Sequence, residues 1–223
     1  MNNILTLTDF MFDGLAYPLN ISLDRGMQIH FIAAGEYDTR SMMQLFTGSK
    51  LPEHGKIMLF ENDTATFSRQ QMLDARKHIG IITHTGNLIS NLKLWENITL
   101  PTMFRLGMVP EQSVKQALQI LDDFGYKGNL MSLPGHLSVF ELRMASFIRA
   151  AISLPKIMLY AGCFDNLSAE ENSLFLQQAI KLQANSPEQV SIYITSGNTA
   201  LEELKPDLTI SLQKDTGRPK RSL

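Results

Sequence analysis

The sequence has a single cysteine, almost no net charge and no long apolar run, and each of these shortages excludes a class of protein. Cys163 stands alone among 223 residues, so the chain forms no internal disulfide and suits a reducing compartment. With 20 basic and 22 acidic residues the net charge is −2, so no overall field attracts nucleic acid. No stretch approaches the length of a membrane span, and no signal peptide is expected. We therefore expect a cytoplasmic protein that reaches a membrane only through a partner.

The residues that are present indicate one α/β domain over residues 1–223. The composition, 44% hydrophobic and 19% charged, is typical of soluble globular proteins. Strand patterns alternate with helix patterns, which predicts a mostly parallel sheet, and early strands without a helix between them predict an antiparallel β flank. The expected strands are 4–8, 19–23, 27–32, 56–61, 79–83, 156–160, 190–195 and 208–212, with a turn at Asp13-Gly14 between the first two.

Capping boxes predict three of the helix starts, at Ser68, Ser138 and Ser168. Residues 86–98 are expected to form a loop with apolar anchors. A short helix ending near Leu204 is expected to be capped by Asn198 or Ser196. The other expected helices span residues 39–47, 72–78, 110–124, 138–152 and 168–182, the last two beginning at Ser138 and after Ser168. In the helix over 110–124, one face is formed by Val114, Ala117, Leu118, Leu121 and Phe124.

Residues 26–48 have the strand, loop and helix order of a phosphate-binding P-loop without its chemistry. Such a loop needs Gly-x-x-x-x-Gly-Lys-Ser/Thr, so that bare amides and one ammonium can hold phosphates. Asp38 is the expected N-cap of the helix, where its carboxylate complements the helix dipole. The positions of the two glycines, the lysine and the Mg²⁺-binding hydroxyl are occupied by Ala33, Asp38, Thr39 and Arg40.

Several other stretches along the chain also carry motif-like patterns. The most specific is residues 86–98, Gly-Asn-Leu-Ile-Ser-Asn-Leu-Lys-Leu-Trp-Glu-Asn-Ile. With the other stretches (55–57, 79–84, 133–138 with Arg149-Ala150, 155–160, 192–196) it resembles the ATPase subunit of ABC transporters from about Leu5 to Asn198. Residues 67–69 and 86–98 look most like the ATPases of MCE-type lipid-trafficking transporters.

The resemblance implies a P-loop NTPase core and a helical subdomain over 87–134. In the family, two subunits bind ATP and Mg²⁺ between the P-loop of one and the signature motif of the other. This chain departs from the family at each catalytic motif. Ala161 and Gly162 stand at the positions of the Walker B aspartate and the catalytic glutamate. The Q-loop glutamine, the switch histidine and the D-loop aspartate are replaced by His84, Ser196 and Ser168. The corresponding P-loop frame consists of Ala33, Gly35, Glu36, Asp38, Thr39, Arg40 and Ser41.

Several of these residues have two interpretations. Arg40 is either a solvated or paired cation or a phosphate ligand. Ser138 stands at the signature serine, but Val139 and Phe140 replace the glycines, which favours a plain helix cap. His84 is either a ligand or a polar rim residue. Phe12, with Tyr17 as a second candidate, either stacks on adenine or packs in the core.

The sequence therefore predicts a catalytically degenerate ABC subunit that acts by protein binding, with no cofactor expected. Its expected partners are a membrane permease and a second ABC ATPase subunit, alike or different, and no nucleic acid. Two alternatives remain: a working ATPase with unusual motifs, and a free-standing regulatory protein. The expected permease-docking residues, at the groove beside the helical subdomain, are Leu88, Ile89, Leu92 and Trp95.

Overall fold

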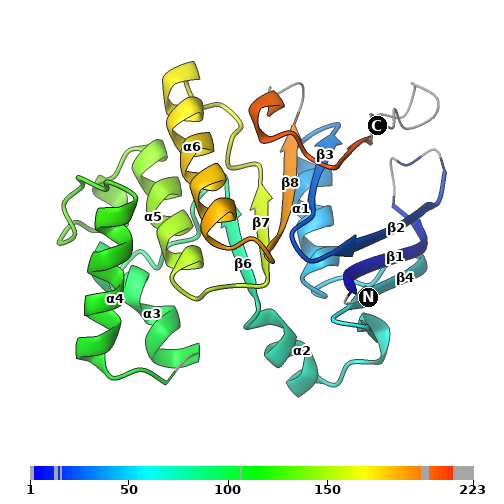
Figure 1. Ribbon diagram of the computed structural model, residues 1–223, viewed down its shortest axis with the longest axis horizontal. Coiled ribbons are helices and arrows are strands. Elements are labelled where there is room, and N and C mark those ends of the chain that lie inside the picture. Colours follow the sequence, from blue (N-terminus) through cyan, green and yellow to red (C-terminus); the bar gives the residue numbers. More distant parts are fainter. Residues whose placement is uncertain (1–2, 13–14, 16, 106, 197–200, 213–223) are drawn as a thin grey trace.

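A five-stranded parallel sheet forms the middle of the molecule (Figure 1). The structure is a computed structural model that describes residues 3–12, 15, 17–105, 107–196 and 201–212. Helices cover both faces of the sheet, so its central strands are largely buried, and all five residues of β7 are buried. The strand order is β6-β7-β8-β3-β9, with β3 Gln28–Ala33, β6 Ile79–Thr83, β7 Ile157–Ala161, β8 Val190–Ser196 and β9 Leu208–Ser211.

A smaller antiparallel sheet lies at the side of the parallel one, which confirms the expected flank (Figure 1). β1 is its central long strand and pairs with both β2 and β4. The expected turn at Asp13-Gly14 lies outside the described residues. The strands, in the order β2-β1-β4-β5, are β1 Asn3–Met11, β2 Leu19–Asp24, β4 His54–Leu59 and β5 Asn62–Asp63.

Three of the six α-helices in the described residues begin at a capping box that the sequence predicted. Ser68, Ser138 and Ser168 each cap a helix, and in each box the side chain three residues later accepts a hydrogen bond from the backbone of the capping serine. The three predicted capping boxes are thus confirmed. The helices are α1 Glu36–Phe46, α2 Arg69–Arg76, α3 Leu94–Arg105, α4 Pro110–Asp123, α5 Val139–Ala151 and α6 Ala169–Asn185, with 3-10 turns at Thr64–Thr66, Pro134–His136 and Glu202–Leu204.

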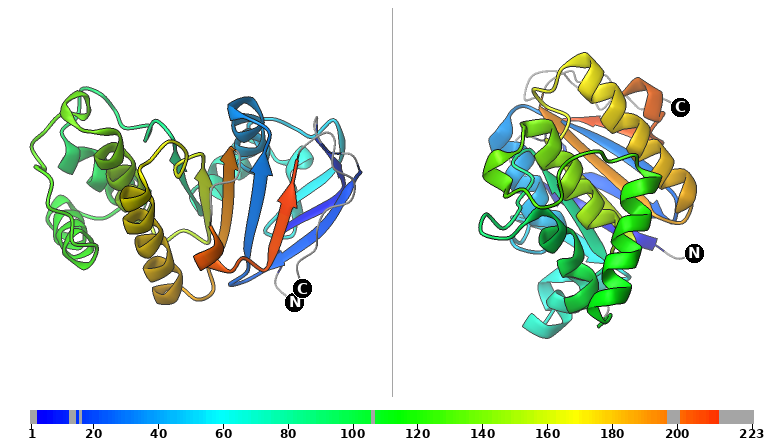
Figure 2. Two further views of the ribbon diagram at one scale, coloured as in Figure 1. Left: turned by 90° about the horizontal axis from the view of Figure 1, so that it is seen from above. Right: turned by 90° about the vertical axis from the view of Figure 1, so that its left-hand side faces the viewer.

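Alternate residues of the parallel strands serve two separate cores. In β7, Met158 and Tyr160 pack in the cluster that contains Phe175 of α6. The intervening Leu159 packs in the cluster that contains Phe46 of α1. Successive side chains of a strand point to opposite faces, and α1 and α6 lie on opposite faces of the sheet (Figure 2).

Two expectations about α3 and α4 need correction. Residues 94–98 belong to α3, and are not loop. α3 escaped prediction because it has no single apolar face and contains Pro101 in its interior. On α4, Val114 and Leu118 are 36% and 53% exposed, so only part of the predicted face is buried.

The last helix prediction was also wrong in part. Ser196 ends β8, so it caps no helix, and Asn198 lies outside the described residues. The 3-10 turn Glu202–Leu204 does stand near the expected position. Across the described part of the chain, no helix combines the length and the apolarity needed to cross a membrane.

Candidate functional site

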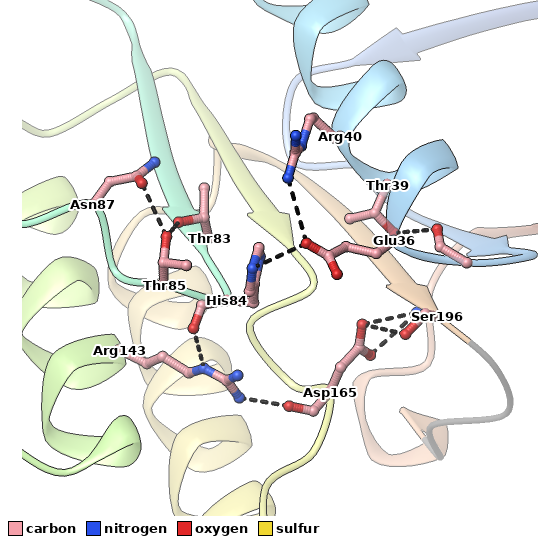
Figure 3. Close-up of polar contacts among 11 residues, drawn as sticks. Glu36, Thr39, Arg40, Thr83, His84, Thr85, Asn87, Arg143, Asp165 and Ser196 are labelled. Carbon is pink, nitrogen blue, oxygen red and sulfur yellow. Dashed lines mark hydrogen bonds and ion pairs between the residues drawn. The ribbon is translucent and has the colours of Figure 1, made fainter.

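Polar side chains gather at the carboxyl ends of β3, β6, β7 and β8 (Figure 3). This edge is where open parallel α/β sheets bind their ligands. The segments that follow the four strands all contribute to it. The labelled side chains here are Glu36, Thr39 and Arg40 from α1, Thr83, His84, Thr85 and Asn87 around the end of β6, Arg143 from α5, Asp165 after β7, and Ser196 at the end of β8.

Glu36, Arg40 and His84 form what we call the outer cluster. One oxygen of Glu36, Oε1, lies 3.2 Å from Nε2 of His84 and 3.5 Å from Nη2 of Arg40. The three side chains are 65%, 64% and 39% exposed, in the order Glu36, Arg40, His84, so solvent screens both contacts. Glu36 nevertheless brings negative charge to the N-terminus of α1, the end of a helix that attracts phosphate.

The start of α1 differs from the sequence prediction. Gly35 is the N-cap, with extended backbone and no side-chain cap, and Thr39 donates from both its amide (3.1 Å) and its hydroxyl (3.2 Å) to the Gly35 carbonyl. The prediction that Asp38 is the N-cap was wrong, because the helix begins at Glu36 and Asp38 lies within its first turn. Ser41 is buried in the helix, with 4% exposure.

A pocket of about 280 Å³ separates α1 from the segment after β6. All three residues of the outer cluster line it, and Ala161 forms part of its wall. Thr85 lies beside it and links Thr83, at 3.2 Å, to Asn87, at 3.0 Å. The pocket therefore brings Glu36, Thr39 and Arg40 of the expected P-loop frame together with His84 and Ala161.

Arg143, Asp165 and Ser196 form a second group, which we call the inner cluster. The Asp165 carboxylate accepts hydrogen bonds from the Ser196 amide at 3.0 and 3.1 Å and from its hydroxyl at 2.6 Å. Ser196 was predicted from the sequence as the switch position, whereas Asp165 was missed. Asp165 has no local motif around it, and its partner is 31 residues away.

Arg143 is the other residue that sequence reasoning missed. It is 4% exposed, and its guanidinium donates to the carbonyls of His84 (2.9 Å), Cys163 (3.2 Å) and Asp165 (2.6 Å). Burial lowers the pKa of Arg143, while the nearby charges of Asp165 and others oppose this. The available signal was a charged residue on the largely buried helix α5.

Ala161 and Gly162 are the residues that the sequence resemblance aligns with the family's acidic positions. Gly162 has φ +68°, and its amide donates to the Ile194 carbonyl at 2.8 Å. A Cβ at Gly162 would lie 3.3 Å from Oδ2 of Asp165. This left-handed backbone favours glycine over any residue that carries a Cβ.

A buried histidine lies under the inner cluster. Nε2 of His30, on β3, is 2.9 Å from the Thr195 hydroxyl, on the neighbouring β8. Burial lowers the pKa of His30 to about 4, and the negative charge of Asp165 partly opposes this. His30 is therefore neutral at physiological pH.

Two of the open interpretations now have a geometric answer. Ser138 caps α5, and its hydroxyl accepts from the Glu141 amide at 3.2 Å. Phe12 is 6% exposed within the core, which favours packing over adenine stacking, whereas Tyr17 is 58% exposed. Cys163 is buried, and burial raises the pKa of its thiol well above the usual range.

The expected docking residues lie near the start of α3. Ile89 and Trp95 are 41% and 36% exposed, Leu92 is half-buried, and Leu88 packs against the core. A groove of about 500 Å³ runs beside them between α1, β6 and α3. The four expected residues do not line this groove; its described walls include Met43, Arg76, Leu100, Pro101, Phe104 and Arg149.

Comparison with known proteins gives a consistent group of relatives, although no protein-family model matches the chain. The phospholipid transport ATP-binding protein MlaF of Haemophilus influenzae is 23% identical over 64% of this chain, a match that spans 54% of MlaF. The lipoprotein-releasing system ATP-binding protein LolD of Coxiella burnetii is 25% identical over 89% of this chain and 84% of LolD.

Solved structures agree in fold. A dimeric ATP-binding cassette in a post-hydrolysis state, bound to ADP and Pi, has a TM-score of 0.82 at 19% identity, covering 98% of this chain and all (100%) of that one. The parallel sheet, the antiparallel sheet and the helices described above match that cassette fold. The chain is therefore a homologue of ABC transporter ATP-binding subunits and has the fold of an ABC ATPase cassette.

Proposed function

We propose that this ABC subunit does not hydrolyse ATP and acts by binding other proteins, as a component or regulator of a membrane transporter. The main support is the charge of the 280 Å³ pocket. Among the described residues that line it there is no lysine and no aspartate, and its one carboxylate is Glu36, which faces His84 and Arg40.

Phosphoryl transfer in P-loop proteins relies on positioned positive charge. A lysine, a Mg²⁺ ion and loop amides neutralise the phosphates, and the protein does little covalent chemistry. Removing one such electrostatic group commonly lowers the rate by about 10²–10³, and here several are replaced together. We propose that ATP and Mg²⁺ are therefore not used as cofactors by this chain.

The proposed partners follow from the family. The names of the relatives connect them with phospholipid transport and lipoprotein release, so lipid is the cargo class that we favour for the transporter. A second ABC ATPase subunit would supply the hydrolysis, and a permease would hold the chain at the cytoplasmic side of the membrane. The 500 Å³ groove, with Phe104 78% exposed beside it, supports docking of a permease segment.

A working ATPase with unusual residues is the second candidate. Its relatives are ATP-binding proteins, and Arg40 is 64% exposed with only a 3.5 Å ion pair to hold it. The Arg40 guanidinium is therefore free to turn toward a phosphate, as a lysine does in the family.

Calorimetric titration with Mg·ATP, together with a phosphate-release assay, separates the two candidates. We expect no binding at micromolar ATP and no release above the buffer rate. A micromolar dissociation constant with turnover that is lost in Arg40→Ala and kept in the matched surface control Arg69→Ala would establish the ATPase instead.

A further inference from the structure

The 500 Å³ groove between α1, β6 and α3 has walls of different chemistry, and β6 runs between α2 and α3 (Figure 1). Its volume is within the size range of small-molecule sites. The wall that α3 supplies is apolar and consists of Leu100, Pro101 and Phe104. Another part of the wall is polar and basic, and consists of Thr47, Ser49 and Arg76. The groove therefore suits a molecule with one polar end and an apolar body.

Arg76 brings a fixed positive charge to the polar wall. Its Nε donates to the Thr47 carbonyl at 2.8 Å, and its Nη2 donates to the Ser49 hydroxyl at 3.0 Å. Both acceptors are uncharged, and the acidic residue of α2, Asp74, pairs with Lys77 at 2.6 Å. The described residues that line the groove include no aspartate and no glutamate. Arg76 is partly exposed, so the N–H groups that it does not use in these two bonds can donate to a molecule in the groove.

A second guanidinium, that of Arg149 on α5, lines the same groove. It donates to the Asn87 carbonyl at 2.7 Å and to the Gly86 carbonyl at 3.1 Å, and these bonds fix its orientation. The planar guanidinium group matches the spacing of the oxygens of a carboxylate or a phosphate. We therefore expect the polar end of a bound molecule to be anionic.

Phe104 gives the apolar wall an exposed aromatic ring. It is 78% exposed, and its neighbours in the wall, Leu100 and Pro101, are partly exposed. Met43 of α1, also partly exposed, adds a further apolar side chain to the groove. Removing such surface from water favours binding in proportion to the apolar area that is covered. A hydrocarbon chain can cover this wall because it has no polar group that would need a partner there.

We propose that the groove binds a single-chain anionic amphiphile. Its carboxylate or phosphate head pairs with Arg76, and its hydrocarbon chain lies along Leu100 and Phe104. This binding does not rest on the proposed function, because it needs neither nucleotide nor a permease. The amphiphile would occupy the groove to which a permease segment is proposed to dock, so the two occupants would exclude each other.

NMR titration of the full chain with octanoate tests this proposal. Two further probes separate the parts of the ligand: 1-octanol has the same chain without the charge, and acetate has the head without the chain. We expect saturable shifts of the amide signals of Gly80, Ile81 and Phe104, with octanoate binding about tenfold more tightly than either of the other probes. Equal affinities for octanoate and 1-octanol, or for octanoate and acetate, would overturn the proposal.

Arg76→Gln removes the charge from the polar wall and leaves the apolar wall in place. It should weaken octanoate binding about tenfold and leave 1-octanol binding unchanged. Arg69→Gln, at an exposed position of the same helix and outside the groove, is the matched control and should change neither affinity. An Arg76→Gln protein that binds octanoate as tightly as the wild type would show that the head lies elsewhere, against the proposal.

A second variant keeps the test decisive should Arg76→Gln fail to fold. Phe104 is mostly exposed, so Phe104→Ala should fold normally. It should weaken octanoate and 1-octanol alike, about three- to tenfold, because both chains lose the same apolar contact. Unchanged affinities for both probes would mean that the chain does not lie on α3, and the proposal would be wrong. Since no titration contains nucleotide or a permease, a negative result here would leave the proposed function standing.

Discussion

The outer and inner clusters lie side by side at the same sheet edge but are held by different forces (Figure 3). In the outer cluster, the exposed carboxylate of Glu36 contacts the side chains of His84, at 3.2 Å, and Arg40, at 3.5 Å. The inner cluster has a buried arginine and a carboxylate that bond mostly to backbone groups, at 2.6–3.2 Å. Exposed ion pairs are worth about 0–1 kcal/mol, whereas a buried polar group that loses its partner costs about 1–3 kcal/mol. We therefore expect the inner cluster to fix the site and the outer cluster to tune its charge.

The largest effect should come from Arg143. Arg143→Met keeps most of the side-chain volume but removes donors to three carbonyls in the segments after β6 and β7. The free energy of unfolding should fall by about 3–5 kcal/mol, measured by urea denaturation. Arg69→Met, on an exposed surface, is the control and should change it by less than about 0.5 kcal/mol. If Arg143→Met lowered the free energy of unfolding by less than about 1 kcal/mol, the inner cluster would not be more important for stability than the outer cluster.

His30 should make stability depend on pH. The pKa of His30 is about 4 in the folded chain, whereas its ordinary value is 6.5. Between pH 4 and 6.5 the imidazole is therefore protonated in the unfolded chain but not in the folded one. Stability should be full above pH 6.5 and fall by about 3 kcal/mol as the pH drops to 4, at 1.36 kcal/mol per pKa unit. His30→Gln should flatten this part of the profile relative to wild type, and an unchanged slope would show that other groups cause it.

Asp165 connects the buried histidine with the inner cluster. Asp165→Asn weakens the acceptor for Ser196, and should lower the free energy of unfolding by about 1–2 kcal/mol. It also removes the negative charge that raises the pKa of His30, so that pKa should fall further in an NMR titration. Asp74→Asn, at an exposed position, should leave the His30 titration as it is. A higher His30 pKa in Asp165→Asn would contradict the assigned sign.

The smallest effect should come from the outer cluster. Glu36→Gln removes the negative partner of His84 and Arg40, yet unfolding should change by less than about 1 kcal/mol. Any change should shrink further when denaturation is repeated at high salt, because salt screens exposed charges. A large, salt-independent loss would mean that the two clusters do not differ as described.

Local signals made much of the fold predictable. The capping boxes at Ser68, Ser138 and Ser168 need only residues three apart, and all three helices start there. Apolar runs bounded by turns were enough for the parallel strands, as at residues 190–195. The start of α1 was misplaced because Gly35 caps it without a side chain, so no polar pattern marks it.

The site was only half predictable for a similar reason. Glu36, Arg40 and His84 stand at motif positions of the family resemblance, so each was a candidate site residue from the sequence. Arg143 and Asp165 act through partners far away along the chain: Arg143 bonds to a carbonyl 59 residues away. Contacts of that separation leave no period or spacing in a single sequence, and only the folded chain brings them together.

The backbone at Gly162 determines how an acidic pair could be rebuilt in this chain. Ala161 ends β7 with regular pairing to β6 and β8, so an aspartate fits the existing backbone at that position. Gly162, at φ +68°, resists any L-residue by about 1–2 kcal/mol, and a glutamate there would also approach the carboxylate of Asp165. To place a carboxylate side chain at position 162, residues 162–165 would have to be remodelled first. The shape of this turn therefore supports the proposed function independently of the pocket lining, which has no lysine among its described residues.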